Sequence, residues 1–210
     1  MAKGFFVTGT DTNVGKTVLS ALLCAALPGI YWKPIQTGAR EGTDRQTVLA
    51  LTETGEQNAV PETFIFDDPV SPHLAAQRAK GLISLDDIRL PASTYDLPLI
   101  VEGAGGVLVP VNGSQFMSDL IVQLSLPTIL AARSTLGTIN HTLLSLQALR
   151  ILSVPVLGVV LIGPSNPDNK EAIERFGKVQ VIGEIPVLDQ ISRPVLREVF
   201  ANNFIREAFI

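Results

Sequence analysis

The chain has few of the residues that mark several large classes of protein. It has one cysteine, Cys24, among 210 residues. A single cysteine excludes an internal disulfide and favours a cytosolic protein. Charged residues are only 17% of the chain, no cluster of Lys and Arg appears, and the net charge at pH 7 is −4. A protein that binds DNA or RNA usually has a basic face, so we expect no nucleic-acid partner.

Long apolar runs are also absent. No run reaches the roughly 18 residues that a membrane-spanning helix needs. The apolar stretch after Met1-Ala2-Lys3 is too short for the core of a signal peptide. Hydrophobic residues nevertheless make up 46% of the sequence, enough for one compact domain with a full core. We predict a globular cytoplasmic protein with no membrane partner.

Short apolar runs alternate with amphipathic stretches, which is typical of a parallel sheet with helices on both faces. The predicted strands are Phe5–Thr8, Ile30–Lys33, Leu97–Val101, Thr128–Ala131, Val156–Ile162 and Val179–Ile182. The predicted helices are Lys16–Leu27, Asp44–Glu53, Pro72–Lys80, Met117–Leu124, Thr138–Leu152, Asp168–Phe176 and Arg193–Asn203. We predict one α/β domain over residues 1–210 with a doubly wound, mostly parallel sheet. In such a sheet, ligands bind beyond the carboxyl ends of the strands.

A glycine-rich loop follows the first predicted strand. It reads Gly9-Thr10-Asp11-Thr12-Asn13-Val14-Gly15-Lys16-Thr17 and leads into an apolar helix. Backbone amides at a helix start face an anion, a lysine reaches the outer phosphates, and a hydroxyl binds magnesium. Gly9 lies one residue earlier than in the usual pattern G-x-x-x-x-G-K-S/T. The strand before and the helix after still predict a P-loop NTPase with a deviant Walker A loop, and a chance Gly-Lys-Thr is the alternative.

Three more polar residues lie where predicted strands end or helices begin. Glu102 ends the third strand before Gly103–Gly106, where an acid can hold magnesium or cap a turn. Lys33 ends the second strand, and a buried lysine is costly unless it reaches an anion; the alternative is a lysine that extends to solvent. Asp44 starts a predicted helix, so it either binds the metal or takes the commoner capping role.

Five segments together resemble the dethiobiotin synthetase family. They are Val7–Thr17, Lys33–Gly38, Val101–Gly106, Leu136–His141 and Gly183–Pro186, and Ser71-Pro72-His73 lies in the expected place. The resemblance implies a magnesium-dependent ligase of biotin biosynthesis that joins carbon dioxide to 7,8-diaminopelargonate with ATP as co-substrate. One amine would capture carbon dioxide as a carbamate. The carbamate would attack the terminal phosphoryl group of ATP, and the second amine would then close the ring and expel phosphate.

The resemblance also implies roles for residues in these segments. Lys33, Lys16 and Thr12 would be catalytic, and Thr17, Asp44 and Glu102 would hold magnesium. The implied nucleotide contacts are Asn13, Val14, Gly15, Lys16, Thr17, Val18, Asp44, Glu102, Gly103, Ala104, Gly105, Gly163, Pro186 and Val187. The implied substrate contacts are Thr12, Lys33, Thr37, Gly106, Leu136, Gly137, Thr138 and Asn140. His73 and His141 receive no catalytic role, since a turn-stabilising imidazole explains each as well.

In the family, the loop corresponding to Ser134–Asn140 serves the active site of the partner subunit, so the resemblance implies a homodimer. Its backbone amides would bind the remote carboxylate of the substrate. The chain also has an apolar C-terminal run, comprising Val199, Phe200, Phe204, Ile205 and Phe209. We predict that this run packs within its own chain rather than at the dimer surface.

The chain departs from the family where the base should bind. The family has an Asn-Asp pair after the strand that here ends in Ile162 and Gly163, and its Asn reads the adenine edge. Neither Ile162 nor Gly163 has a side-chain hydrogen-bonding group. We therefore predict a relaxed preference for ATP over other nucleoside triphosphates.

A switch ATPase similar to MinD and ParA is the alternative function. Such proteins share the stretched phosphate loop, but they need a signature lysine early in it, where this chain has Asp11. The sequence also has no basic amphipathic tail. We therefore prefer the ligase.

Overall fold

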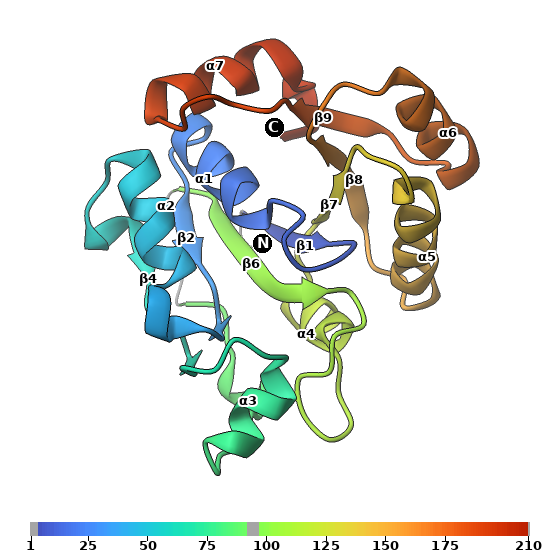
Figure 1. Cartoon of the computed structure of the whole chain (residues 1–210). Helices are drawn as coiled ribbons and strands as arrows, with labels where there is room; N and C mark the ends of the chain where they lie inside the picture. Colours follow the sequence, from blue (N-terminus) through green and yellow to red (C-terminus); the bar gives the residue numbers. More distant parts are fainter. Residues whose placement is uncertain (1–3, 92–96, 210) are drawn as a thin grey trace.

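A parallel sheet is the centre of the computed structural model, which describes residues 4–91 and 97–209 (Figure 1). Its strand order is β4-β2-β6-β1-β7-β8-β9, and each pairing is parallel. In that order the strands are Ala59–Val60, Ile30–Trp32, Leu99–Gly106, Gly4–Gly9, Thr128–Arg133, Val156–Ile162 and Val181–Ile185. Beside it lies a two-stranded parallel sheet of β3 (Ile35–Gln36) and β5 (Phe64–Ile65).

Helices lie between strands along the chain, and the final helix follows the last strand of the large sheet. They are α1 (Lys16–Ala26), α2 (Asp44–Thr52), α3 (Pro72–Arg78), α4 (Met117–Leu124), α5 (Thr138–Ile151), α6 (Pro167–Gly177) and α7 (Arg193–Asn203). Short 3₁₀ turns cover Ala39–Glu41, Glu56–Asn58, Leu85–Asp87 and Arg206–Phe209. Within the described residues, no helix has both the length and the apolar composition to cross a membrane.

The sheet separates two hydrophobic cores. Successive strand residues point to opposite faces. Val7 and Ile100 therefore belong to the core that includes residues of α1, α2 and α7, whereas their neighbours Phe6 and Val101 belong to the core that includes residues of α4, α5 and α6. Both faces are covered, so the predicted doubly wound fold is confirmed.

Each predicted helix is present, and the bounds of α4, α7 and β8 match the prediction. The predicted end of the third strand was wrong. Strand β6 continues past Glu102 to Gly106 because it stays paired with β1, with Gly9 opposite Gly106. Strand β9 begins at Val181 rather than Val179. The short strands β3, β4 and β5 were not predicted, since two residues carry no periodic signal.

Most of the apolar C-terminal run packs within the chain, as predicted, whereas Ile205 is 37% exposed. Val199, Phe200 and Phe204 are buried, and the rings of Phe200 and Phe204 lie 5.2 Å apart between centroids. The ring of Phe209 lies 5.6 Å from that of Phe5 in β1. These contacts fix α7 and the final 3₁₀ turn beside α1 and β9.

Candidate active site

The phosphate loop joins β1 to α1 in the predicted strand–loop–helix arrangement. Gly15 caps α1 in the left-handed region, with φ of 97°. A Cβ atom at Gly15 would lie only 2.9 Å from Cδ1 of Ile162, so the loop packs directly against the end of β8. The first amides of α1 have no carbonyl partner within the helix, which leaves them suited to bind a phosphate.

Lys16 is buried at the start of α1 and bonds back to the loop. Its Nζ donates to the backbone oxygen of Asp11 at 2.9 Å. Burial lowers the pKa of Lys16 to about 8, and the nearby charges of Glu102 and Asp44 offset this only in part. A bound phosphate would give this buried ammonium a further negatively charged partner.

Four predicted site residues from separate segments meet beside this loop. The Oγ1 atom of Thr17 lies 3.0 Å from Oδ1 of Asp44 and 3.0 Å from Oε1 of Glu102. The ammonium of Lys33 lies 3.3 Å from Oε1 of Glu102 and also donates to Oδ2 of Asp44. Lys33 and Glu102 are 7% and 1% exposed, whereas Thr17 and Asp44 are partly exposed, so this is a charged cluster with a buried centre. Lys33 therefore does not extend to solvent, and Glu102 lies within a strand instead of capping a turn.

The alternation of the strands places these side chains on one face. Tyr31 and Lys33 lie two residues apart along the chain at β2, as Ile100 and Glu102 do on β6, and Tyr31 is paired with Ile100. Tyr31 and Ile100 both belong to the core shared with α1 and α2. The hydroxyl of Tyr31 donates to Oε2 of Glu102 at 3.0 Å. Tyr31 was not predicted as a site residue, because a tyrosine in an apolar strand looks like ordinary core.

The charges of this cluster support one another. Burial opposes the charged form of Lys33, but the carboxylates of Glu102 and Asp44 outweigh it and raise the pKa of Lys33. Burial, followed by the charge of Glu102, raises the pKa of Tyr31 well above its ordinary value. Lys33 therefore stays an ammonium and Tyr31 stays a hydrogen-bond donor.

The capping role considered for Asp44 is taken by its neighbour. Thr43 is the N-cap of α2, and it accepts a bond from the amide of Gln46 while the Gln46 side chain accepts one from the amide of Thr43. The amide of Asp44 donates to Oε1 of Gln36 at 3.1 Å. Gln36, buried beside Thr37, was also missed by the sequence analysis. It ties the loop after β3 to the start of α2 and so helps aim Asp44 at Thr17.

The donor set suits a magnesium ion. Two carboxylates and one hydroxyl converge, all with hard oxygen atoms, and Thr17 has a single proton to share between the two acids. Within the described residues, no group of three or more His, Cys, Asp or Glu side chains could hold a metal. Magnesium is usually bound by one or two carboxylates together with phosphates and water, which matches this arrangement.

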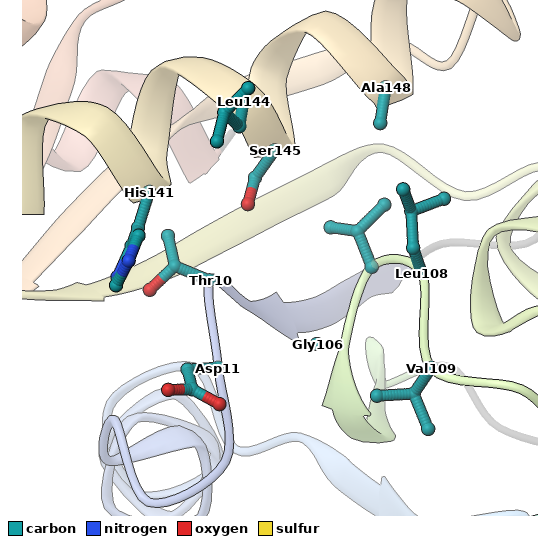
Figure 2. Close-up of a pocket in the computed structure, with 10 residues that line it drawn as sticks. Thr10, Asp11, Gly106, Leu108, Val109, His141, Leu144, Ser145 and Ala148 are labelled. Atoms are coloured by element: carbon teal, nitrogen blue, oxygen red, sulfur yellow. The ribbon is translucent and has the colours of Figure 1, made fainter.

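A cavity of about 360 Å³ lies next to the phosphate loop, between the end of β6 and α5 (Figure 2). Its lining comprises Thr10, Asp11, Gly106, Val107, Leu108, Val109, His141, Leu144, Ser145 and Ala148. Gly106 is the predicted substrate contact in this set, and Thr12 and Thr37 do not line it. Figure 2 shows the side chain of His141 next to Thr10. The positions on α5 were missed because helical spacing alone does not reveal which face borders a cavity.

The predicted carboxylate loop, Ser134–Asn140, contributes no residue to that cavity lining, although His141 directly after it does. Leu136 is 98% exposed at the start of this loop, and Gly137 and Asn140 are exposed beside it. Thr138 is buried, and its hydroxyl lies 3.4 Å from that of Thr142. Any contact from Thr138 to a substrate would therefore come from its backbone.

The predicted base contacts lie at the ends of β8 and β9. Gly163 has φ of 129°, and a Cβ atom there would lie 2.7 Å from Oγ of Ser134. The amide of Gly163 donates to the carbonyl of Ile185 at 2.9 Å. Pro186 and Val187 follow β9 and are exposed. These three positions offer no side-chain hydrogen-bonding group.

Solved structures with the same fold include a ParA family ATPase and chloroplast FtsY. A ParA family ATPase from Chlorobium tepidum TLS matches with a TM-score of 0.55 and 14% identity, over 95% of this chain and 91% of that one. Chloroplast FtsY from Physcomitrella patens matches with a TM-score of 0.54 and 12% identity, over 100% of this chain and 64% of that one. At these identities the likeness shows the P-loop NTPase fold alone.

Sequence comparison gives a more specific result. A family model described as an AAA domain matches residues 3–195. The ATP-dependent dethiobiotin synthetase BioD of Brucella melitensis biotype 2 is 46% identical over 204 residues, which is 97% of this chain and 95% of that protein. The protein of the same name from Brucella ovis has the same identity and coverage. The chain therefore belongs to the dethiobiotin synthetase family.

Proposed function

We propose that the protein closes the ureido ring of dethiobiotin from 7,8-diaminopelargonate and carbon dioxide at the expense of ATP. The observation that carries this proposal is the partly buried cluster of Lys33, Thr17, Asp44 and Glu102 beside a phosphate loop. In a chain that belongs to this family, these groups are suited to activate a phosphoryl group next to a bound amine. The same family membership supports a role in biotin biosynthesis and, as an expectation, in the cytoplasm.

The two amines of 7,8-diaminopelargonate take different parts in the reaction. One amine captures carbon dioxide as a carbamate, and a carbamate oxygen attacks the terminal phosphoryl group of ATP. The second amine attacks the resulting carbamic–phosphoric anhydride, which closes the ring and releases phosphate. Lys33 stabilises the carbamate and the charge that develops during transfer, and Lys16 neutralises the phosphates. The hydroxyls of Thr12 and Thr37 would orient the diamine end of the substrate.

Backbone groups hold the nucleotide. The loop and first turn formed by Asn13, Val14, Gly15, Lys16, Thr17 and Val18 surround the phosphates with amides. Gly103, Ala104 and Gly105 allow the end of β6 to approach the nucleotide. Gly163, Pro186 and Val187 border the base at the ends of β8 and β9. These assignments follow from the position of each segment at the carboxyl edge of the sheet.

Thr17, Asp44 and Glu102 are the residues that would hold a magnesium ion. The ion would neutralise charge on the outer phosphates of ATP. The ammonium of Lys33 pairs with both carboxylates. The two acids therefore already bind a positive charge in this structure. The protein groups thus position the phosphoryl group and compensate its charge, which is most of what phosphoryl transfer requires.

We also infer a homodimer, formed through α5 and the loop before it. Exposed apolar side chains gather there and near the cavity mouth: Leu108 (59%), Leu136 (98%), Leu144 (57%) and Ile151 (75%). Leu144, Ala148 and Ile151 share one face of α5 by helical spacing. A second copy covering this face would place its loop, with Leu136, Gly137, Thr138 and Asn140, near the remote carboxylate of the substrate. Sedimentation velocity should show a dimer, and a monomer at micromolar concentration would refute this assembly.

One assay tests the proposed function. The protein is mixed with 7,8-diaminopelargonate, bicarbonate, magnesium and ATP, and dethiobiotin is measured by mass spectrometry. Matched reactions omit one component each, and an AMP control replaces ATP. We expect dethiobiotin and ADP in equal amounts from the complete mixture alone. Hydrolysis of ATP with no dethiobiotin would overturn the proposal and favour a switch ATPase.

A further inference from the structure

The two carboxylate oxygens of Glu102 have different partners. Oε1 faces Thr17 and Lys33, at 3.0 Å and 3.3 Å. Oε2 accepts the hydroxyl of Tyr31 at 3.0 Å, and it has no other hydrogen-bond partner among the described residues. Tyr31 is fully buried and Glu102 is 1% exposed. The Tyr31 bond therefore lies on the side of the carboxylate away from the phosphate loop.

Strand pairing makes this contact specific. β2 and β6 are neighbours, with Tyr31 opposite Ile100, and Glu102 lies two residues further along β6 on the same face. A phenol ring in this position spans the distance from β2 to the Glu102 carboxylate. Trp32, the next residue, belongs to the other core and contacts the carbonyl of Pro61 instead. One hydroxyl of the apolar core is thus directed at one oxygen of a buried acid.

We propose that Tyr31 is a positioning residue for the magnesium site, acting through Glu102. By binding Oε2, Tyr31 fixes the rotation of the carboxylate so that Oε1 faces Thr17 before the metal arrives. Outer hydrogen bonds of this kind orient metal ligands, and their loss typically lowers metal affinity or activity by about 10- to 100-fold. Tyr31 touches neither substrate nor nucleotide in this role. The inference rests on the proposed magnesium site formed by Thr17, Asp44 and Glu102.

The substitution Tyr31→Phe removes the hydroxyl and keeps the ring. The affinity for Mn²⁺ is measured by electron paramagnetic resonance in the presence of a non-hydrolysable ATP analogue, together with the Mg²⁺ concentration at half-maximal ring closure. We expect Tyr31→Phe to weaken Mn²⁺ binding about 10-fold or more and to raise the half-maximal Mg²⁺ concentration in proportion. The KM for 7,8-diaminopelargonate should stay within about twofold.

Ser20→Ala is the matched control. Ser20 is fully buried in α1, and its hydroxyl has no hydrogen-bond partner among residues 4–91 and 97–209, so the control also deletes one buried hydroxyl near the same core. We expect its Mn²⁺ affinity to match that of the parent protein. Thermal unfolding of both variants separates general destabilisation from an effect on the metal.

A double-mutant cycle with Glu102→Gln tests whether Tyr31 affects metal binding through Glu102. If Tyr31 acts through Glu102, Tyr31→Phe should change Mn²⁺ affinity by less than twofold in the Glu102→Gln protein. An equal effect in both backgrounds, or a lowered melting temperature with unchanged Mn²⁺ affinity in Tyr31→Phe, would overturn the proposal. Binding of Mn²⁺ and nucleotide does not require ring closure, so failure to make dethiobiotin is a separate result that bears on the proposed function alone.

Discussion

The phosphate end and the base end of the sheet differ sharply in chemistry, although both lie at the same carboxyl edge. At the phosphate end, Lys16, Lys33, Asp44 and Glu102 place four charged groups around Thr17. At the base end, Ile162, Gly163, Pro186 and Val187 offer backbone and apolar surface. We therefore expect the chain to recognise the triphosphate by charge and the base by shape and backbone contacts.

The two ends are joined by close packing. Gly15 of the phosphate loop lies against the side chain of Ile162, so that a Cβ atom at Gly15 would come within 3.0 Å of two Ile162 carbons. Ile162, which stands where the family has the Asn that reads the base, thus also packs against the phosphate loop. Substitutions at the phosphate end should lower turnover strongly, whereas substitutions at the base end should have a smaller effect on turnover.

The largest effect is expected from Lys33→Ala. Removing a preorganised charge next to the transferring group should lower turnover by about 10²-fold or more, with ATP binding largely retained. Because Lys33 pairs with two acids in the folded protein, we also expect the free energy of unfolding to fall by about 3 kcal/mol. Steady-state kinetics and urea unfolding measure the two effects.

Lys170→Ala is the matched control at the base end. Lys170 pairs with Glu184 at 2.7 Å, and its side chain is 37% exposed. An exposed pair of this kind contributes about 0.2–1 kcal/mol, so turnover with ATP should change little. If Lys33→Ala kept the turnover of the parent protein, Lys33 would have no catalytic role.

The next largest effect concerns Lys16 in the protein free of nucleotide and metal. Its folded pKa of about 8 is below the ordinary 10.5, so the unfolded chain binds this proton more readily. Below pH 8 the buried charge destabilises the fold, and between pH 8 and 10.5 this penalty disappears as the proton is lost. Lys16→Met should therefore stabilise the protein at pH 7, by up to about 3 kcal/mol.

The gain from Lys16→Met should shrink as the pH rises from 8 towards 10.5. Urea unfolding of the parent protein and the variant at matched pH values measures this difference, and effects of other titrating groups largely cancel. A gain that is the same at pH 7 and pH 10 would show that Lys16 carries no cost of buried charge.

The smallest effect is expected from changing the base. Losing one or two base hydrogen bonds removes about 1–3 kcal/mol of discrimination. GTP and CTP should therefore support ring closure with kcat/KM within about 10²-fold of ATP. Turnover with the four triphosphates at equal concentration decides this. A preference for ATP above about 10³-fold would mean that backbone groups near Gly163 read the adenine edge.

The fold was predictable from sequence because helices α1, α4, α6 and α7 have an amphipathic pattern and several long strands a continuous apolar run. The phosphate loop was predictable because its chemistry is local, from Gly9 to Thr17. Lys33 and Asp44 could be nominated because a lysine at the end of a buried strand and an acid at a helix start are informative by themselves. The single domain over residues 1–210 stays a prediction.

Other features depend on pairing between distant segments. That β6 continues past Glu102 depends on its partner β1, and the role of Gln36 depends on where α2 begins. Tyr31 looked like core because nothing in its own strand shows that its hydroxyl reaches Glu102 on the neighbouring strand. The cavity face of α5 likewise depends on the position of Val107–Val109 across from it.

A crystal structure with Mg²⁺ and a non-hydrolysable ATP analogue tests the central claim most directly. We expect one octahedral ion with Thr17, Asp44 and Glu102 around it, directly or through water, and Lys16 moved from the carbonyl of Asp11 to the phosphates. We also expect Lys33 beside the terminal phosphoryl group. A structure in which Asp44 stays bonded only to Lys33, far from the ion and the phosphates, would contradict the assignment of this charged cluster as the magnesium and phosphoryl-transfer site.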